Sequence, residues 1–137
     1  MLQYGFFVSF KMADPMLLIW GDDCLSELAD MFRGLGQRRL HAVRFDDEPW
    51  THTEHGCSVV FNLASGNHSV LRLCGTCQIT SIHCDLTSED LFRFAEQVEA
   101  LAAHDCKAGH QYLDVLGEQP IQLMVSKGEY SIGWPLP

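Results

Sequence analysis

Basic residues are scarce in this chain. Its 137 residues include nine Lys and Arg against 18 Asp and Glu, which gives a formal net charge of −9. A negative chain repels the phosphate backbone of DNA and RNA, so this balance argues against a nucleic-acid-binding surface. The same charge attracts a basic protein, although acidic residues also serve simply to keep a protein in solution.

A long hydrophobic run is also lacking. The apolar residues 1–10 are interrupted by Gln3 and Gly5 and are too few to span a bilayer. They lack the basic region, the long apolar core and the small-residue cleavage site of a secretory signal peptide. We therefore expect a cytoplasmic protein without membrane contact, in which the six cysteines stay reduced.

Low-complexity segments and internal sequence repeats are missing as well. A chain of 137 residues, of which 47% are hydrophobic, fits one globular domain. The clear alternation of strand and helix patterns begins at Met16, which is itself a possible start. We predict a single α+β domain over residues 16–137, with residues 1–15 as an N-terminal extension or an edge strand.

The first half shows a strand, a helix and a second strand. Residues 16–20 form a short apolar run, and the turn at residues 21–23 offers carboxylates as a helix cap. Residues 25–35 repeat apolar side chains at helical spacing up to Gly34 and Gly36, which we expect to end the helix. Residues 40–45 alternate in a way that favours a strand.

The middle of the chain is rich in β-forming residues. Residues 57–63 and 69–73 are two such runs, and the turn-forming residues 64–67 between them indicate a hairpin. A third run covers residues 78–84. The simplest arrangement of these runs is an antiparallel meander.

A capped amphipathic helix follows. Thr87 or Ser88 caps it, its apolar residues form one stripe up to Ala102, and Gly109 is expected to end it. Residues 121–125 then alternate as a final strand. The predicted fold is α+β: an antiparallel sheet of about five to six strands with two helices, the longer one packed on one face.

Familiar catalytic motifs are absent from the sequence. It contains no nucleophile elbow, phosphate-binding loop or dinucleotide fingerprint. His110 lies among polar residues, and we interpret it as part of a helix-terminal turn. We therefore expect a protein that is not an enzyme and that carries no cofactor.

One cysteine pair leaves an alternative open. Cys74 and Cys77 have the spacing of half a zinc site, with His52 and His55 as upstream ligand candidates. A structural site needs a matching second pair, which is not evident, so no metal is expected. The alternative function is a small zinc-binding module or a metal-dependent enzyme built on these four residues, with Cys84 nearby.

Acidic residues gather at the predicted ends of elements and in loops. If the fold brings these ends together, the carboxylates form a negative rim with a tryptophan as an aromatic anchor, which suits a basic protein partner. Solvated turns are the ordinary explanation for such residues. The candidate partner-binding residues are Asp22, Asp23, Asp46, Asp47, Glu48, Trp50 and Glu54.

The C-terminal half, roughly Val70 to Tyr130, resembles small bacterial immunity proteins of polymorphic toxin systems. The resemblance is carried by residues 71–73, the helix capped at Thr87, the motif Gly-His-Gln-Tyr-Leu-Asp at 109–114, and residues 121–130. It implies a cytoplasmic α+β protein that binds a cognate toxin and neutralises it by occluding its active site or by holding it in an inactive form. Many such toxins are basic nucleases, which an acidic surface attracts. The oligomeric state is not predicted.

Overall fold

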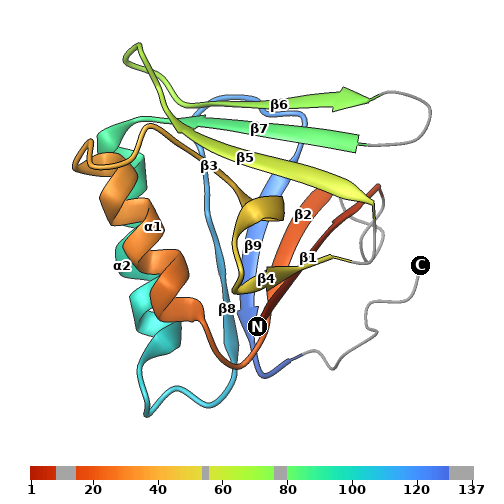
Figure 1. Cartoon of the computed structure of the whole chain (residues 1–137), viewed down its shortest axis with the longest axis vertical. Helices are drawn as coiled ribbons and strands as arrows, with labels where there is room; N and C mark the ends of the chain where they lie inside the picture. The colour runs from red at the N-terminus through yellow and green to blue at the C-terminus, as the bar shows by residue number, and fades with distance from the viewer. Residues whose placement is uncertain (9–14, 54–55, 76–79, 130–137) are drawn as a thin grey trace.

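The fold is α+β (Figure 1). This computed structural model describes residues 1–8, 15–53, 56–75 and 80–129. Within these residues it has two helices and nine strands in two mixed sheets. The elements run in the order β1 (Leu2–Phe7), β2 (Met16–Trp20), α1 (Leu25–Gly36), β3 (Ala42–Arg44), the 3₁₀ turn η2 (Phe45–Asp47), β4 (Thr51–His52), β5 (Cys57–Leu63), β6 (Val70–Gly75), β7 (Thr80–Leu86), α2 (Ser88–Ala102), β8 (Gly109–Tyr112) and β9 (Gln122–Lys127).

The two sheets are not the single antiparallel sheet that the sequence predicted. The five-stranded sheet has the order β4-β1-β2-β9-β8 and the four-stranded sheet the order β3-β5-β7-β6. The central pairs, β2 with β9 and β5 with β7, are both parallel. In Figure 1 the helices lie together on one side, and the two sheets spread away from them.

The predicted hairpin between β5 and β6 is wrong. Strand β7 lies between them, pairing parallel with β5 and antiparallel with β6. Burial explains the order, since Ile82, Cys84 and Leu86 of β7 are fully buried, whereas all residues of β6 except Leu71 are exposed. A strand with one buried residue suits a sheet edge, and a strand with three suits the centre.

The chain consists of two topologically equivalent halves. In the first half, hairpin β1-β2 lies in the five-stranded sheet, α1 follows, and the pair β3-β5 lies in the four-stranded sheet. In the second half, β6-β7 lies in the four-stranded sheet, α2 follows, and β8-β9 returns to the five-stranded sheet. Each half therefore contributes one antiparallel pair to each sheet, and β4 of the first half adds a fifth strand beside β1. Each central parallel pair joins one strand from each half.

Helix α1 departs from the prediction at its start. Its N-cap is Cys24 in a left-handed conformation without a side-chain cap, so Asp22 and Asp23 do not cap it. The helix ends at Gly36 as predicted, and Gly34 and Gly36 are buried in its last turn. A Cβ at Gly34 would lie 2.9 Å from Cδ1 of Leu40, so a larger residue there would displace the end of that leucine side chain.

Helix α2 begins as predicted and ends earlier. The hydroxyl of Thr87 accepts a hydrogen bond from the backbone N–H of Asp90 at 3.2 Å, which confirms the cap. The helix stops at Ala102, and Gly109 lies in β8. His110 is therefore a strand residue, and its interpretation as part of a helix-terminal turn is wrong. In β8 the backbone N–H and C=O groups of this segment form their hydrogen bonds with β9.

Aromatic rings link the helices to the sheets through the core. Phe94 of α2 packs edge-on against Phe32 of α1, and Phe32 packs against Phe61 of β5. Phe61 then contacts Phe45, whose ring meets those of Tyr4 and Trp50. A second, smaller cluster with Leu18 and Trp20 covers the opposite face of β2. Strand β1 thus belongs to the main core, since Leu2 and Tyr4 are almost completely buried.

We expect Phe94→Ala to lower the free energy of unfolding by about 3–5 kcal/mol, because it leaves a cavity beneath both helices. Urea unfolding followed by circular dichroism measures this change. Leu116→Ala is the matched control: its side chain is 91% exposed, so the substitution should change stability by less than about 0.5 kcal/mol. Equal effects of the two substitutions would contradict the placement of Phe94 in the core.

Candidate partner-binding groove

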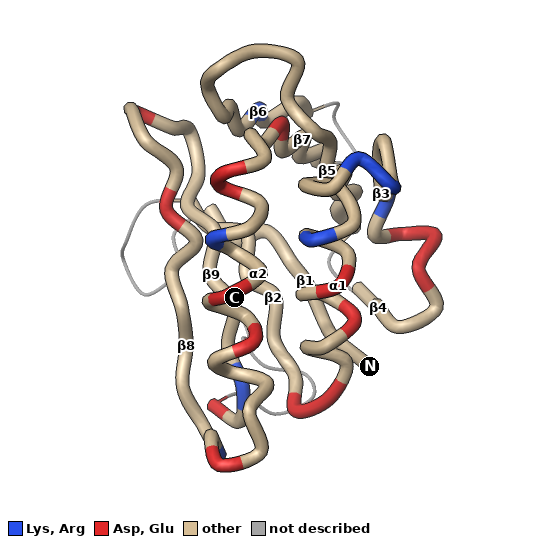
Figure 2. Tube along the Cα trace, turned by 90° about the vertical axis from the view of Figure 1, so that its left-hand side faces the viewer, with Lys and Arg blue, Asp and Glu red and all other residues tan. Residues whose placement is uncertain are grey.

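A groove runs between helix α1, strand β3 and the segment that leads from β3 to β4. Its volume is about 410 Å³. We call it the α1 groove, and the residues that line it are Glu27, Asp30, Met31, Leu40, Ala42, Val43, Glu48 and Trp50. Figure 2, viewed from the helix side, shows Asp and Glu positions along α1 and in the segment between β3 and β4. The groove is therefore apolar at its walls and acidic at its rim.

The segment after β3 is held as a defined turn. The backbone N–H of Glu48 donates to the carbonyl of Phe45 at 3.0 Å, which closes η2. The hydroxyl of Thr51 donates to the carbonyls of Phe45 and Glu48, and the ring of Phe45 is fully buried. These contacts fix the position of Glu48 relative to the core.

Trp50 is half-buried and held on three sides. Its indole N–H donates to Oε2 of Glu48 at 3.1 Å, and its ring packs edge-on against Phe45 at 5.6 Å. Its carbonyl accepts a hydrogen bond from the backbone N–H of Leu2 at 2.8 Å. The N-terminal strand thus supports the wall of the groove.

Asp46 has a structural role. Its carboxylate accepts a hydrogen bond from the hydroxyl of Tyr4 at 3.0 Å and a longer one from the backbone N–H of Val59 at 3.4 Å. Partial burial acts to raise the pKa of Asp46, but hydrogen bonds from Ser58, Tyr4 and Val59 outweigh it and leave this pKa below its usual value. Burial and the Asp46 carboxylate in turn raise the pKa of Tyr4.

The other predicted carboxylates are spread around α1. Asp47 is exposed, and Arg44 lies 3.9 Å from it and 3.7 Å from Asp46, so this arginine partly neutralises both. Asp22 and Asp23 precede α1, where Asp23 pairs with the N-terminal ammonium group. Glu54 lies outside the described residues. Of the predicted set, Glu48 and Trp50 line the groove, and Asp46 and Asp47 belong to the adjacent turn.

Sequence reasoning missed Glu27 and Asp30. Both are exposed on α1 and line the groove. Neither side chain has a hydrogen bond or ion pair to another of the described residues. Their spacing of three residues places them on one helix face, and this was the available signal. Glu48 follows Asp30 by 18 residues in the sequence, and only the tertiary structure shows that it lines the same groove.

The metal-site candidates are separated or lie outside the described part of the chain. His52 is exposed on β4 of the five-stranded sheet, and Cys74 is exposed on β6 of the four-stranded sheet. Cys84 is fully buried in β7, and burial raises the pKa of its thiol. His55 and Cys77 fall outside the description. Among the described residues, no group of three or more His, Cys, Asp and Glu side chains is arranged to hold a metal ion.

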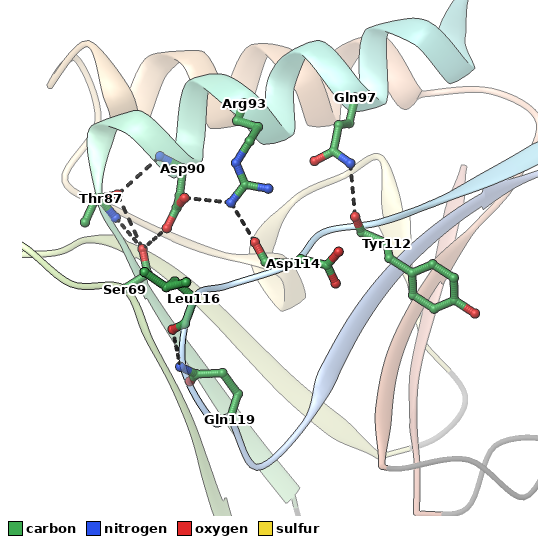
Figure 3. A network of polar contacts seen from close by, with 9 residues as sticks. All are labelled: Ser69, Thr87, Asp90, Arg93, Gln97, Tyr112, Asp114, Leu116 and Gln119. Carbon is green, nitrogen blue, oxygen red and sulfur yellow. Dashed lines mark hydrogen bonds and ion pairs between the residues drawn. The ribbon is translucent and has the colours of Figure 1, made fainter.

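The second half has a comparable segment after β8, and here polar side chains of α2 bond directly to the segment (Figure 3). Arg93 of α2 donates to Oδ1 of Asp90 at 2.7 Å and to the carbonyl of Asp114 at 2.6 Å. Gln97 donates to the carbonyl of Tyr112 at 3.0 Å. At the far end of this segment, Oε1 of Gln119 accepts a hydrogen bond from the backbone N–H of Leu71 in the edge strand β6. These bonds hold the segment against α2 and the edge of the four-stranded sheet.

Comparisons with protein-family models, curated proteins and solved structures found no match for this chain. Among the described residues, no helix is both long enough and apolar enough to cross a membrane. The chemistry of the α1 groove is therefore the basis for the functional assignment.

We expect Asp46→Asn to reduce the free energy of unfolding at neutral pH by about 1 kcal/mol, since hydrogen bonds to a charged acceptor are lost from a partly exposed site. The pKa of Asp46 is lower in the folded state, so its ionised form stabilises the fold above the unfolded pKa of about 3.9. This contribution disappears as the pH falls through the folded pKa. Unfolding curves between about pH 7 and pH 3 should therefore show the two proteins converging in stability.

The matched control is the exposed Asp105, which follows α2. Asp105→Asn should change stability little at any pH in this range. A pH-independent difference between wild type and the Asp46 variant would contradict the stabilising role of the ionised carboxylate.

Proposed function

We propose that this chain is an immunity protein that binds a basic toxin protein and neutralises it by occluding the toxin's active site, without catalysis of its own. The observation that supports this most is the α1 groove, which Glu27, Asp30 and Glu48 line together with the half-buried ring of Trp50. Aromatic anchors in partly desolvated pockets contribute much of the energy of protein interfaces, and acidic rims steer basic partners. The cytoplasm is the compartment in which such a protein meets its toxin.

The groove is suited to binding because its parts are already in place. Trp50 is fixed by Phe45, by Glu48 and by the backbone of β1. A side chain that is ordered before binding loses little conformational entropy when the partner arrives. The net charge of −9 extends the attraction beyond the groove and repels nucleic acids, so a protein partner is the better match.

The alternative is a zinc-binding module or metal-dependent enzyme built on His52, His55, Cys74 and Cys77. One experiment separates it from the immunity function. Native mass spectrometry of the chain, alone and co-expressed with the product of the adjacent open reading frame, reads metal and partner together. A metal-free mass and a stable one-to-one complex are expected. A bound zinc ion that is lost with chelator, without a complex, would favour the alternative.

We expect the double variant Asp47→Lys/Glu48→Lys to slow association with the basic partner by about tenfold at low ionic strength, because charges on the rim act through steering. Stopped-flow association rates over a salt series measure this. The wild-type rate should fall steeply with salt and the variant rate should fall less. Asp46 is left unchanged because the fold depends on it.

The double variant Asp105→Lys/Glu118→Lys is the matched control for this series, because it changes the net charge by the same amount. Both residues are exposed and neither lines the α1 groove. Their reversal should alter the rate far less than that of Asp47 and Glu48 does. Equal slowing by both variants would show that net charge alone acts, and it would remove the groove from the interface.

A further inference from the structure

The two halves of the chain can be compared position by position along their helices. Helix α1 begins at Leu25 and α2 at Ser88, so Glu27 and Asp90 are both third residues. Asp30 corresponds in the same way to Arg93. Glu27 and Asp30 line the α1 groove together with residues of the segment after β3. In the second half, Arg93 donates to the carbonyl of Asp114 in the segment after β8, and Asp90 accepts hydrogen bonds from Arg93 and Ser69.

The second half has an arginine in this place. The guanidinium of Arg93 lies 2.7 Å from the carboxylate of Asp90, 2.6 Å from the carbonyl of Asp114 and 5.0 Å from the ring centroid of Phe94. It therefore combines a carboxylate, a backbone carbonyl and an aromatic ring. Asp114 lies two residues after β8, as Asp46 lies two residues after β3.

The first half has an acidic residue at the sixth helix position, where the second half has Arg93. The position of Arg93 is taken by Asp30, so the groove contains the carboxylates of Glu27, Asp30 and Glu48 beside the ring of Trp50. Among the described residues, no Lys or Arg lines this groove. A cationic side chain in this groove is attracted by all three carboxylates.

We infer that the α1 groove takes one arginine side chain of the protein partner. This inference rests on the proposed function and names the group that the site recognises. The guanidinium lies between Glu27, Asp30 and Glu48, and its aliphatic stem lies on the apolar walls of the groove. Arginine fits better than lysine because its planar fork donates to two carboxylates at once and stacks on an indole.

The apolar walls favour a side chain over a free metal ion. Met31, Leu40, Ala42 and Val43 make up half of the lining, and the methylene groups of arginine bury this surface whereas a hydrated cation does not. The indole N–H of Trp50 occupies only one oxygen of Glu48. The second oxygen remains an acceptor for the guanidinium.

The test uses the full chain labelled with ¹⁵N and the small probes L-argininamide, L-citrullinamide and L-lysinamide. Citrullinamide has nearly the same shape as argininamide and no side-chain charge. The indole N–H resonance of Trp50 reports occupancy of the groove, and Trp50→Phe assigns it among the three tryptophans. Saturable shifts of this resonance are expected with argininamide, with an affinity about tenfold higher than for citrullinamide.

Variants locate the binding site. Glu27→Gln/Asp30→Asn should weaken argininamide binding about tenfold, and the control Glu118→Gln should leave it unchanged. All of these residues are exposed, so the fold should tolerate the substitutions, and the remaining resonances check this. The comparison of argininamide with citrullinamide on the wild type needs no variant. Equal shifts with these two probes, or binding of lysinamide as tight as that of argininamide, would overturn the inference.

The arginine site and the proposed function can each fail without the other. A one-to-one complex in native mass spectrometry without a Trp50 response to argininamide would overturn the arginine site and leave the binding function standing. A Trp50 response without any complex would support the arginine site and count against the immunity function. The probe titration therefore tests the groove independently of the toxin.

Discussion

The fold depends on the pairing of strands from the two halves of the chain within each sheet. Each half places one antiparallel pair of strands in each sheet, and the central pairs β2-β9 and β5-β7 each join strands from different halves. Neither half completes a sheet on its own. Helices α1 and α2 connect the sheets and pack against each other through Phe32 and Phe94. The sheets, the helix pair and the core therefore form together.

This arrangement places the candidate site where both sheets and a helix meet. The segment after β3 crosses from the four-stranded to the five-stranded sheet, and its buried Phe45 contacts Tyr4, Phe61 and Trp50. The same segment carries Asp46, which accepts a bond from Tyr4, and Glu48, which accepts one from Trp50. The acidic rim is thus attached to the core and not to a free loop. A binding surface fixed in this way keeps its shape before a partner arrives.

The two halves have similar architecture but different electrostatics. Around α2, Arg93 joins Asp90 to the carbonyl of Asp114, so the charges of these two side chains are paired within the chain. Around α1, the corresponding position is Asp30, and the carboxylates there face an open groove. One region stabilises the fold, and the other presents charge to the surroundings. A partner with a basic side chain matches the second region.

The sequence by itself determined the α+β class, the two helices, the Thr87 cap and most of the strands, because these depend on local periodicity and on contacts between neighbouring residues. It also singled out Glu48 and Trp50 as candidate binding residues. Tertiary structure alone decided the parallel central pairs, the order of β5, β6 and β7, and the strand at His110. It alone brought Glu27 and Asp30 to the rim. Strand order depends on which surfaces are buried together across long separations, and local patterns carry little information about those contacts.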